Sequence, residues 1–550
     1  MLLYVWTTMT YLAVPIAAKN PDEARQQINS AIAAGAEMLE LRTDYLENLT
    51  VDLVRELIAA AKDAGGKRLP LTVTCRDSRQ GGAIAYPLQL RLDVLTTALK
   101  AGAEFIDFEY ENFLIVQTQE RIKVALSGSL KGRLILSVHN FETKFANIGK
   151  LYRSILTVYP VAIPKFVYQA DHINDCFEAF DLLHRTGGER IIFCMGEAGV
   201  ISRIIAKKLN SLVTFAALNE EAATAPGQLT IRQLKELYRY DSIDAETELY
   251  GVIADPVAHS LSPAIHNACF ADAGMNKLYL PLLVQGGRRE FDQFIRNVLS
   301  RKWLNFVGFS VTIPHKENAL NFARANQGFI EPLAEKIGAV NTLLISKDDR
   351  IKAYNTDYAA ALDAIASGLG ITRAGLRDLP VAIIGAGGVS RAIVAGLSDA
   401  GAKMKIYNRT LERAQRLAAE FGCEFAPLDD LENIDAKLVI NCTNIGMKRT
   451  EDGKQETEYR RQKTDDQRPK TSHETPVPEE YLKKDMVVFD TVYNPAETLL
   501  LKQAKQVHAK TIDGLSMFIN QAAAQFKLFT GTDANAELMR ETISNCLSHK

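Results

Sequence analysis

At 550 residues the chain is too long to fold around a single hydrophobic core, so its length predicts two or more domains. Apolar residues make up 47% of the chain and charged residues 24%, as in ordinary globular proteins, and no apolar stretch is long enough to cross a bilayer. The formal net charge of −2, without a long run of Lys or Arg, gives no indication of a nucleic-acid-binding surface.

The seven cysteines are scattered and form neither a CxxC pair nor a Cys/His cluster with the spacing of metal ligands. This distribution is typical of reduced, buried thiols, so we expect a cytoplasmic protein without a metal site. The first residues, MLLYVWTTMTYL, are apolar but lack the basic leader of a signal peptide. We expect them to lead directly into a first strand.

Between Tyr11 and about Tyr240, eight short apolar runs alternate with segments of helical periodicity. The runs are YLAVPI, EMLELR, LTVTCR, EFIDFE, LILSVH, AIPKFV, RIIFCM and LVTFA, and helical spacing is clear at 21–34, 88–100 and 172–185. Eight strand–helix units of this kind are typical of a (β/α)8 TIM barrel. An open, doubly wound sheet is the alternative, but eight such units close more naturally into a barrel, which we predict for residues 1–240.

The charged stretch YDSIDAETE (240–248) interrupts this rhythm, and we interpret it as a linker. A second α/β unit begins at Leu249, and LPVAIIGAGG (379–388) opens a third. We expect two lobes of one enzyme: a substrate-binding lobe at 249–355, completed by C-terminal helices at 515–550, and a Rossmann lobe at 356–514. Residues 448–476 contain no aliphatic or aromatic residue except Tyr459, which predicts a solvated, disordered insertion.

Polar side chains stand at the carboxyl ends of the first eight runs, where a barrel would bring them together on one face. Glu40 and Arg42 end the second run, Arg76 the third and His139 the fifth; Lys165 lies in the sixth, Arg203 follows the seventh, and Thr224–Gln228 follow the eighth.

Lys165 lies in an otherwise apolar run, AIPKFV, where its ammonium group would lose its hydration. Burial disfavours the charged form, and a neutral amine can attack a carbonyl to form a Schiff base. Taken alone, a snorkelling or ion-paired lysine is the more common outcome. The catalytic interpretation is favoured because His139, one strand away, could shuttle protons, and several arginines nearby could bind a carboxylate.

Residues 12–236 resemble the type I 3-dehydroquinate dehydratases. The motifs that carry the resemblance are ELRTD (40–44), TCRDSRQGG (74–82), SVHNF (137–141), IPKFV (163–167), MGEAGVISR (195–203) and TAPGQ (224–228). The resemblance implies that Lys165 forms an imine with the ketone of 3-dehydroquinate, that His139 moves the protons, and that Arg203 binds the substrate carboxylate. It assigns the ring hydroxyls and substrate orientation to Glu40, Arg42, Arg76, Thr224 and Gln228.

Two departures from this family pattern stand out. Gln80 occupies a position where the family usually has an acid that orients and tunes the histidine, so we expect a slower or pH-shifted reaction. Thr224 stands where the family more often has Ser, a change that keeps the hydroxyl group.

The run VAIIGAGGVSRA (381–392) is a strand, a glycine-rich turn and the start of a helix. This order is typical of a dinucleotide site, because the turn lets the backbone approach a pyrophosphate at the helix N-terminus. At the end of the next strand, where an NAD site would offer Asp or Glu, the chain has Asn408, Arg409, Thr410 and Arg413. A guanidinium group there favours a 2′-phosphate, so we predict NADP rather than NAD.

From Tyr250 to about Gly531 the chain resembles the shikimate dehydrogenases. Its motifs are GVIADPVAHSLSPAIHN (251–267), GFSVTIPHK (308–316), GAVNT (338–342), NTD (355–357), NCTNIGM (441–447), DTVYNPAETLLL (490–501) and DGLSMFINQA (513–522). Taken singly, several of these would read as helix caps or turns. Ala360 and Phe518 replace the usual Gly and Leu, which we interpret as packing changes.

This second resemblance implies that Lys316 and Asp357 form a catalytic pair: NADPH delivers hydride to the C3 ketone of 3-dehydroshikimate while Lys316 supplies the proton. It assigns the shikimate hydroxyls and carboxylate to Ser260, Ser262, Thr312, Asn341, Asp357 and Gln521. The predicted cofactor-binding residues are Gly385, Ala386, Gly387, Gly388, Val389, Asn408, Arg409, Thr410, Arg413, Thr443 and Gly514. The insertion at 448–476 would either cover the cofactor or extend into solvent.

The order of the two resemblances predicts a bifunctional enzyme of the shikimate pathway and aromatic amino acid biosynthesis, because the product of the first reaction is the substrate of the second. We expect small-molecule substrates only, with no nucleic-acid or membrane partner. One alternative is a quinate dehydrogenase in the second half. Another is a non-catalytic sensor of quinate or shikimate, which should have lost Lys165, His139, Lys316 and Asp357, yet all four are present.

Overall fold

The computed structural model describes residues 9–548 except 67, 259, 347, 349 and 448–473, so the predicted insertion and the first eight residues lie almost entirely outside it. The chain divides into two compact units, Met1–Phe306 and Val307–Lys550, and each is described by itself. The domain limits expected near 240–249 and 355 stay predictions.

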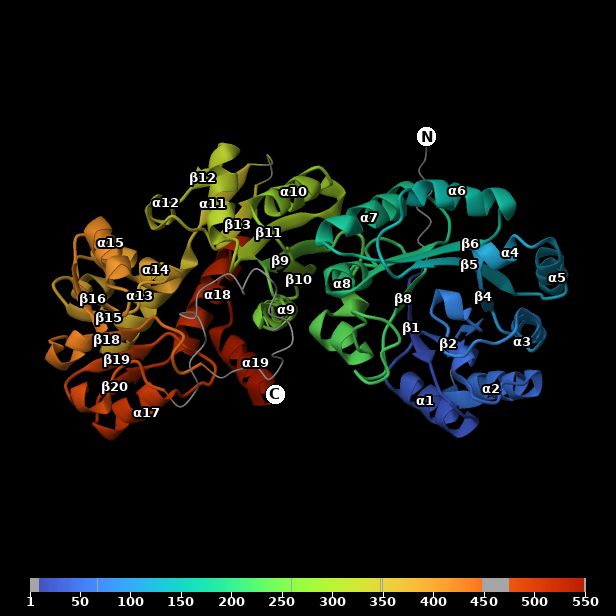
Figure 1. Cartoon of the computed structure of the whole chain (residues 1–550), viewed down its shortest axis with the longest axis horizontal. Coiled ribbons are helices and arrows are strands. Elements are labelled where there is room, and N and C mark those ends of the chain that lie inside the picture. The colour runs from blue at the N-terminus through green and yellow to red at the C-terminus, as the bar shows by residue number, and fades with distance from the viewer. Residues whose placement is uncertain are drawn as a thin grey trace. The chain divides into compact units, whose positions relative to one another are not determined.

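The first part of unit 1 is an eight-stranded parallel sheet with the strand order β7-β6-β5-β4-β3-β2-β1-β8. Its two end strands, β7 and β8, also approach each other, so the sheet curves into an almost closed barrel (Figure 1). The strands are β1 (Tyr11–Ile16), β2 (Met38–Arg42), β3 (Leu71–Thr74), β4 (Phe105–Glu109), β5 (Arg133–Asn140), β6 (Ile163–Gln169), β7 (Ile191–Met195) and β8 (Val213–Phe215). The predicted TIM barrel and all eight of its strands are confirmed.

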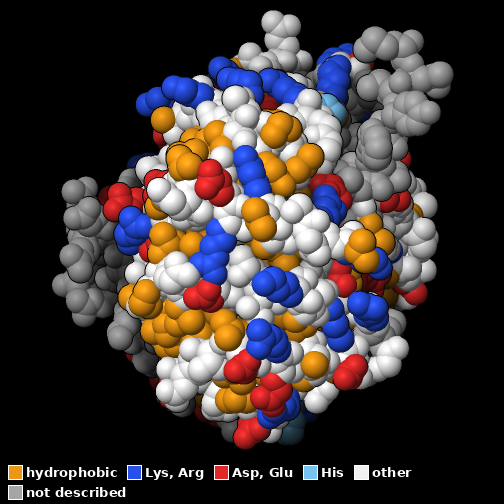
Figure 2. All heavy atoms as spheres, turned by 90° about the vertical axis from the view of Figure 1, so that its right-hand side faces the viewer, with side chains coloured by type: hydrophobic (Ala, Val, Ile, Leu, Met, Phe, Trp, Pro, Cys, Tyr) orange, Lys and Arg blue, Asp and Glu red, His pale blue; other side chains and the backbone are white. Residues whose placement is uncertain are grey.

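Helices follow the strands and cover the outside of the barrel. They are α1 (Pro21–Ala33), α2 (Val51–Asp63), α3 (Leu88–Lys100), α4 (Tyr110–Phe113), α5 (Val116–Ser127), α6 (Ile148–Val158), α7 (Cys176–Arg185) and α8 (Val200–Ile204). Local sequence explains their start points: the Thr50 side chain accepts a hydrogen bond from the backbone N–H of Leu53 and caps α2. Figure 2 shows the outer face of the barrel, where basic side chains are scattered among acidic and apolar ones.

The eighth strand is followed by a short π-helix, η6 (Gln233–Leu237), rather than by a regular α-helix. The rest of unit 1 contains two strands and two α-helices: β9 (Glu248–Ala254), α9 (Ser262–Asp272), β10 (Lys277–Leu283) and α10 (Arg288–Leu299). β9 and β10 pair in parallel over their whole length.

Unit 2 contains two sets of paired strands. In the first set, β13 (Thr342–Ile345) pairs antiparallel with β11 (Phe306–Val311) and with β14 (Ile351–Tyr354), and β14 pairs in parallel with β12 (Phe329–Ile330). The helices that accompany them are α11 (Lys316–Ala325), α12 (Pro332–Ile337) and α13 (Thr356–Leu369).

The second set is a six-stranded parallel sheet in the order β17-β16-β15-β18-β19-β20, which is the order of a Rossmann fold. Its strands are β15 (Pro380–Ile384), β16 (Lys403–Asn408), β17 (Glu424–Pro427), β18 (Leu438–Asn441), β19 (Val487–Asp490) and β20 (Lys510–Ile512). Its helices are α14 (Gly388–Asp399), α15 (Leu411–Phe421) and α17 (Leu499–Gln506), and α18 (Gly514–Thr530) and α19 (Ala536–Ser548) end the chain.

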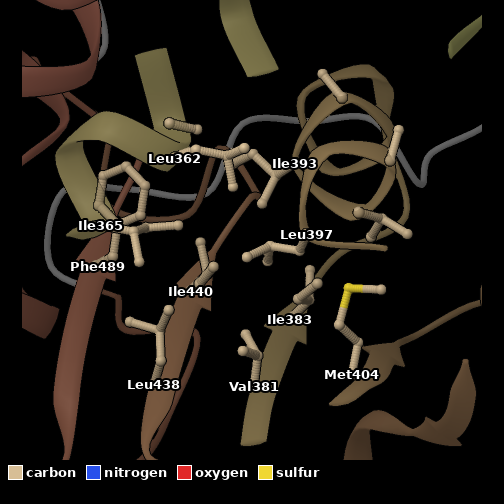
Figure 3. Packing of buried hydrophobic residues seen from close by; sticks show 14 of the residues in the cluster. Leu362, Ile365, Val381, Ile383, Ile393, Leu397, Met404, Leu438, Ile440 and Phe489 are labelled. Atoms are coloured by element: carbon tan, nitrogen blue, oxygen red, sulfur yellow. The ribbon is translucent and has the colours of Figure 1, made fainter. Parts of the chain in front are cut away.

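One face of the Rossmann sheet packs against α13 and α14 in a dry aliphatic core. Ile383 and Ile440 from the sheet meet Ile393 and Leu397 from α14 and Ile365 from α13 (Figure 3), and all five are fully buried. The sheet order reverses between β15 and β18, and ligands of such sheets bind at the carboxyl ends of the strands at that point.

Candidate active sites

A cavity lies at the carboxyl ends of the barrel strands, and polar side chains from strands and loops around the barrel line it. All the residues predicted for the first site are among them: Glu40, Arg42, Arg76, His139, Lys165, Arg203, Thr224 and Gln228. The structure therefore brings together a set that is spread over almost 190 positions of the sequence.

Lys165 is buried in the middle of β6, with 5% of its side chain exposed. Its Nζ lies 2.7 Å from Asp107 Oδ2, 3.9 Å from Glu40 Oε1 and 4.6 Å from the centre of the Phe215 ring. Asp107 thus gives the buried ammonium a counter-ion, which the sequence argument from burial alone did not include.

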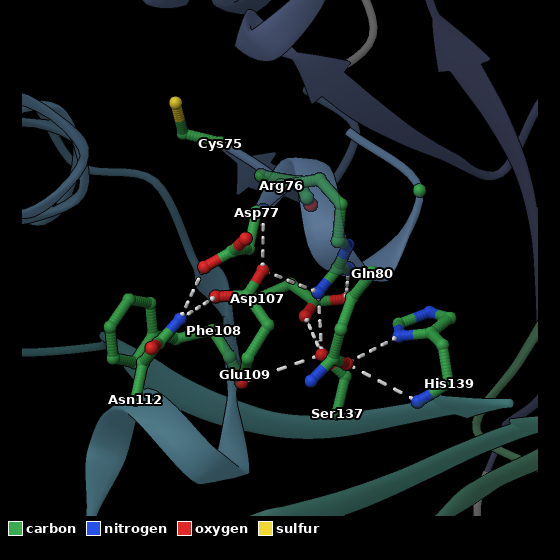
Figure 4. A network of polar contacts seen from close by, with 12 residues as sticks. Cys75, Arg76, Asp77, Gln80, Asp107, Phe108, Glu109, Asn112, Ser137 and His139 are labelled. Atoms are coloured by element: carbon green, nitrogen blue, oxygen red, sulfur yellow. Dashed lines mark hydrogen bonds and ion pairs between the residues drawn. The ribbon is translucent and has the colours of Figure 1, made fainter. Parts of the chain in front are cut away.

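Asp107 is the centre of a buried polar network (Figure 4). Its Oδ2 also lies 2.8 Å from Arg76 Nη2, and its Oδ1 accepts a hydrogen bond from the Ser137 hydroxyl at 2.7 Å. Burial works to raise the pKa of Asp107, but the charges of Arg76 and Lys165 outweigh it and hold that pKa far below its usual range. The carboxylate is therefore a fixed negative charge next to the lysine.

His139, near the end of β5, is held by Gln80. The Gln80 Oε1 accepts the His139 backbone N–H at 3.3 Å and lies 3.2 Å from the ring Nδ1. Burial, together with the nearby charges of Arg76 and Lys165, keeps the pKa of His139 well below its usual value. The imidazole is therefore neutral near pH 7 and able to accept a proton.

Arg203 lies on α8 with its guanidinium 4.5 Å from the centre of the Phe193 ring, and it is almost fully buried. Its Nε and Nη2 have no hydrogen-bond partner among the described residues. Burial lowers the pKa of Arg203 to about 10, which still leaves the group charged at neutral pH. A buried cation with open donors on the cavity wall fits a carboxylate ligand, which would satisfy two donors at once.

The other cavity residues are held by neighbours in ways that fix their orientation. Arg42 forms a bidentate pair with buried Asp44, with distances of 3.0 and 2.8 Å. Gln228 Oε1 accepts hydrogen bonds from the Thr224 backbone N–H and hydroxyl at 2.7 and 3.1 Å. These pairs leave the cavity lined with fixed donors and acceptors of the kind that bind hydroxyl groups.

In unit 2, Lys316 and Asp357 form an ion pair with Nζ and Oδ2 2.6 Å apart. Asn341 donates its amide to Asp357 Oδ1 at 2.9 Å and to the Thr356 hydroxyl at 2.9 Å, which fixes the carboxylate from the other side. Lys316 is the first residue of α11, where the helix dipole is unfavourable for a cation. Asp357 supplies the opposing charge, and the pair is about one-quarter exposed on the lysine side.

The remaining predicted shikimate ligands lie on several elements. Ser262 begins α9 and is buried, and its backbone N–H donates to Ser260 Oγ at 3.3 Å; both serines belong to unit 1. In unit 2, Thr312 lies in the turn before α11, and Gln521 is half-buried on α18, which packs against α13.

The glycine-rich turn leads from β15 into α14 as expected for a dinucleotide site. Gly385 has a φ of +109°, and a Cβ there would lie 3.0 Å from Thr443 Cγ2, so this position needs glycine. No atom lies within 4 Å of a Cβ built on Gly387 or Gly388, so open space remains at the start of α14. A pyrophosphate fits such a site, because the backbone is bare and the helix N-terminus points at it.

The other predicted cofactor residues border the same end of the sheet. Asn408 ends β16 and donates to the Thr410 backbone carbonyl at 2.8 Å, and Arg409 and Arg413 are exposed beside it. Thr443 is bound through its N–H and hydroxyl by the Asn441 side chain. Gly514 begins α18, where a Cβ would lie 2.5 Å from the Val492 carbonyl oxygen. Ala386 lies between Gly385 and Gly387, and Val389, which follows Gly388, is exposed.

Comparison with known proteins gives a relative that spans both halves. The chain is 32% identical, over 97% of its length and 84% of the relative's, to the chloroplastic bifunctional 3-dehydroquinate dehydratase/shikimate dehydrogenase of Arabidopsis thaliana. The chain belongs to this bifunctional family. It is an enzyme with two activities of the shikimate pathway, 3-dehydroquinate dehydratase and NADP-dependent shikimate dehydrogenase.

The family models divide the bifunctional chain in the same order. Residues 12–245 match type I 3-dehydroquinase, 252–343 the shikimate dehydrogenase substrate binding domain, 370–467 shikimate/quinate 5-dehydrogenase, and 514–543 the shikimate 5′-dehydrogenase C-terminal domain. The second half is 39% identical to the NADP(+) shikimate dehydrogenase of Methanocaldococcus jannaschii, covering 55% of this chain and 98% of the relative. A crystal structure of a shikimate dehydrogenase with NADP+ is similar at 37% identity over 56% of this chain and 97% of the other, with a TM-score of 0.46.

Sequence reasoning missed the acidic side of the dehydratase cavity. Asp107 and Glu109 are fully buried on β4, and Glu109 Oε1 lies 3.1 Å from Arg76 Nη1. Their signal was present in the run EFIDFE, where two acids interrupt an apolar strand just as Lys165 interrupts its own.

Among the described residues, no His/Cys/Asp/Glu cluster is placed to hold a metal, and no helix is long and apolar enough to span a membrane.

Proposed function

We propose that Lys165 is the imine-forming residue of the dehydratase and that His139 is its acid–base group. The observation that carries this proposal is the shared cavity, in which a buried lysine, a neutral histidine and a buried arginine with open donors face one space.

The proposed reaction begins when Lys165, an ammonium beside Asp107, passes one proton to neutral His139 and attacks the ketone carbon of 3-dehydroquinate as an amine. His139 returns that proton to the former ketone oxygen, which leaves as water and gives the protonated imine. The imine withdraws electrons from the adjacent carbon, and His139 accepts the proton that this carbon loses. The same histidine then donates a proton to the C1 hydroxyl group, which departs as water. Hydrolysis of the imine releases 3-dehydroshikimate and restores Lys165.

Substrate orientation in the same cavity is assigned to the groups that surround the lysine. Arg203 binds the carboxylate through the two donors that the protein leaves open. The ring hydroxyls are held by Glu40, Arg42, Arg76, Thr224 and Gln228. Asp107 keeps a negative charge beside Lys165 and so favours the iminium ion that replaces the ammonium.

For the dehydrogenase, Lys316 and Asp357 are the proposed catalytic pair. When bound, NADPH supplies a hydride to the C3 ketone of 3-dehydroshikimate. Lys316 gives a proton to the ketone oxygen, and Asp357, at 2.6 Å, orients the ammonium. The shikimate hydroxyls and carboxylate are assigned to Ser260, Ser262, Thr312, Asn341, Asp357 and Gln521.

The cofactor is assigned to the turn between β15 and α14 and to the loop after β16. Gly385, Ala386, Gly387, Gly388 and Val389 would hold the pyrophosphate against the N-terminus of α14. Arg409 and Arg413, with Asn408 and Thr410, would hold the 2′-phosphate, because both guanidinium groups are exposed at the end of β16. Thr443 and Gly514 would border the nicotinamide end.

The proposal also includes the domain limits, the location and the partners of the protein. We keep the domain limits at 1–240, 249–355 with 515–550, and 356–514. A cytoplasmic location is supported by the sequence, in which the seven cysteines are scattered and form neither a CxxC pair nor a cluster with the spacing of metal ligands. The expected partners are the small-molecule substrates and NADP, with neither nucleic acid nor a membrane among them, and no oligomeric state is assigned.

One set of reactions tests these residue roles. Purified wild-type enzyme, K165A and K316A receive 3-dehydroquinate and NADPH, and enone absorbance and NADPH oxidation are followed together. We expect K165A to form no enone and to oxidise no NADPH until 3-dehydroshikimate is added. K316A should build up enone and oxidise NADPH at least about a hundredfold more slowly than wild type.

Controls make the result specific to each site. Borohydride reduction of the wild-type reaction should leave a covalent adduct on the peptide that contains Lys165, and K165A should carry none. Lys150 and Lys352 are exposed lysines, so K150A and K352A should match wild type in both signals. An adduct on another residue, or normal enone formation by K165A, would contradict the proposed role. Quinate with NAD+ in the same assay tests the alternative dehydrogenase specificity.

A further inference from the structure

The helix α10 and the short helix η8 (Lys302–Leu304) lie within the part of the chain that matches the dehydrogenase, yet they belong to the same compact unit as the barrel. On the barrel they face α7 and the preceding turn η4 (Ile173–Asp175). We call this contact the α7–α10 interface. Neither proposed active site uses its residues.

The centre of the interface is a bidentate ion pair. Arg301 Nε and Nη2 each lie 2.8 Å from an oxygen of Asp181 on α7, and the side chains are only 17% and 20% exposed. The guanidinium also lies 5.0 Å from the centre of the Phe177 ring. Paired planar hydrogen bonds of this kind fix the orientation of two surfaces as well as their distance.

Aromatic and backbone contacts surround this pair. His184 stacks on Trp303 with ring centres 3.9 Å apart and an interplanar angle of 1°. Phe177 meets Phe294 of α10 with a centre distance of 6.0 Å. The turn η4 adds hydrogen bonds from Asn174 Nδ2 to the Glu290 carbonyl at 3.3 Å and from Asn297 to Asn174 Oδ1 at 3.0 Å. Apolar, stacking and polar contacts thus occur together, as in a specific interface.

The stretch that joins barrel and β9 is also fixed on both sides. Lys208 of the barrel is buried and donates to the carbonyls of Ala245 and Thr247 at 2.6 and 2.9 Å. Asn276, just before β10, donates to both carboxylate oxygens of Asp244 at 2.9 and 3.0 Å. A charged segment that looks like a free linker in the sequence is therefore held in place.

Two helices of unit 1 that carry predicted site residues contact the same strand, β10. Helix α8, which carries Arg203, contacts β10, and helix α9, which begins at Ser262, packs on the same strand. Asn267 fastens α9 to β10 through two hydrogen bonds with the Tyr279 backbone, of 2.9 and 2.7 Å. Displacement of β10 would therefore disturb both helices.

We propose that the α7 face of the barrel is the docking surface for residues 249–306 of the dehydrogenase, so that the barrel stabilises the dehydrogenase activity although it takes no part in that reaction. The dehydrogenase of this chain depends on the Arg301–Asp181 contact for its lifetime at elevated temperature. The inference concerns stability and does not rest on the proposed roles of individual catalytic residues.

Charge reversal in the full-length chain tests the docking surface. We would measure the rate of heat inactivation of the dehydrogenase in D181R, R301D and the double variant D181R/R301D. Each single variant should lose dehydrogenase activity about fivefold faster than wild type, and the double variant should regain most of the loss because the pair is restored in reverse. Arg324 and Glu335 form an exposed pair in unit 2 at 2.8 Å, so R324E and E335R are matched controls and should be unaffected.

A second readout uses the fact that the chain has two tryptophans, Trp6 and Trp303. In a W6F background the fluorescence of Trp303 reports its stacking on His184, and it should change in each single variant and return in the double variant. If a reversed charge prevents folding, the neutral variants D181N, R301Q and D181N/R301Q replace the charge-reversed ones. Their effects on the inactivation rate should not add: the double variant should inactivate more slowly than the two single effects together predict. Single variants that inactivate at the wild-type rate, or strictly additive effects in either cycle, would overturn the proposal.

Discussion

At the residue scale, the contact between Gln80 and His139 decides which imidazole nitrogen is available for proton transfer. The His139 backbone N–H can only donate, so the Gln80 side chain must present its oxygen, Oε1, to the histidine. That same oxygen lies 3.2 Å from Nδ1, so Nδ1 carries the hydrogen and Nε2 keeps its lone pair (Figure 4). Gln80 therefore selects the tautomer without adding a negative charge.

This geometry predicts the effect of restoring an acid at the position. In Q80E a carboxylate would lie beside Nδ1, stabilise the imidazolium ion and raise the pKa of His139 from its depressed value. Because the proposed reaction needs neutral His139 as its base, the acid limb of the dehydratase pH profile should move to higher pH in Q80E. The measurement is kcat/KM for enone formation between pH 5 and 9 in both proteins, on the order of one point per half unit.

The dehydrogenase of the same protein serves as the internal control for this change. Its pH profile should be identical in wild type and Q80E, since Gln80 lines the barrel cavity, whereas Lys316 and Asp357 belong to the other compact unit. If the acid limb of the dehydratase stays where it is in wild type, a group other than His139 sets that limb.

The residue scale also shows where sequence reasoning stops. The basic and hydroxyl-bearing residues of the cavity could be predicted, because they stand at the ends of apolar runs and match family motifs. The role of Asp107 could not be predicted in this way, because it depends on a 2.7 Å contact with Lys165, which is 58 positions away in the sequence. The charge state of a buried lysine depends on such a partner as much as on burial.

At the scale of the element, the turn between β15 and α14 contains glycines of two kinds: one that the backbone conformation requires and one that leaves space for a ligand. Gly387 has a φ of −97°, which alanine adopts readily, and its missing Cβ faces open space. We expect G387A to keep the wild-type melting temperature and dehydratase activity while its KM for NADPH rises about tenfold or more, equivalent to a loss of at least about 1.4 kcal/mol of binding. The measurements are thermal unfolding and dehydrogenase kinetics.

Two further glycines make this prediction specific. Gly187, in the barrel, also has free space around a built Cβ, and G187A should change neither stability nor the KM for NADPH. Gly385 has a left-handed φ and a tight contact with Thr443, so G385A should lower the melting temperature as well as cofactor binding. A normal KM for NADPH in G387A would show that the cofactor does not approach this turn.

Whole elements were predicted best where the sheet is buried on both faces. Barrel and Rossmann strands are continuous apolar runs because both of their faces are buried. Helices cover both faces of the Rossmann sheet, whereas the barrel strands have helices outside and packed side chains inside. The short strand β12, whose residues Phe329 and Ile330 are partly exposed, and the π-helix after β8 have no such signal. Their formation depends on tertiary contacts that the local sequence does not encode.

At the scale of the whole molecule, the segment predicted to be a linker shows which contacts composition does not reveal. Residues 240–248 are rich in charged side chains, which predicted exposure, yet Tyr240 is fully buried and its hydroxyl donates to the Thr10 carbonyl at 2.8 Å. Backbone carbonyls of the segment satisfy Lys207 and Lys208 of the barrel. The charged side chains Asp241, Asp244 and Glu246 are exposed, as composition predicts, but the Tyr240 hydroxyl and the backbone carbonyls hold the segment against the barrel.

The same scale yields a prediction about how the two activities combine. The Lys165 cavity and the Lys316–Asp357 pair are made of different residues, and the released product of the first reaction, 3-dehydroshikimate, is a stable small molecule. An equimolar mixture of K165A and K316A should therefore convert 3-dehydroquinate to shikimate with NADPH, although neither variant alone does so at a comparable rate. NADPH oxidation should follow a lag in which free 3-dehydroshikimate accumulates, and the lag should shorten as protein concentration rises.

Absence of conversion by the mixture, with each variant active in its own half-reaction, would mean that the intermediate passes between sites only within one chain.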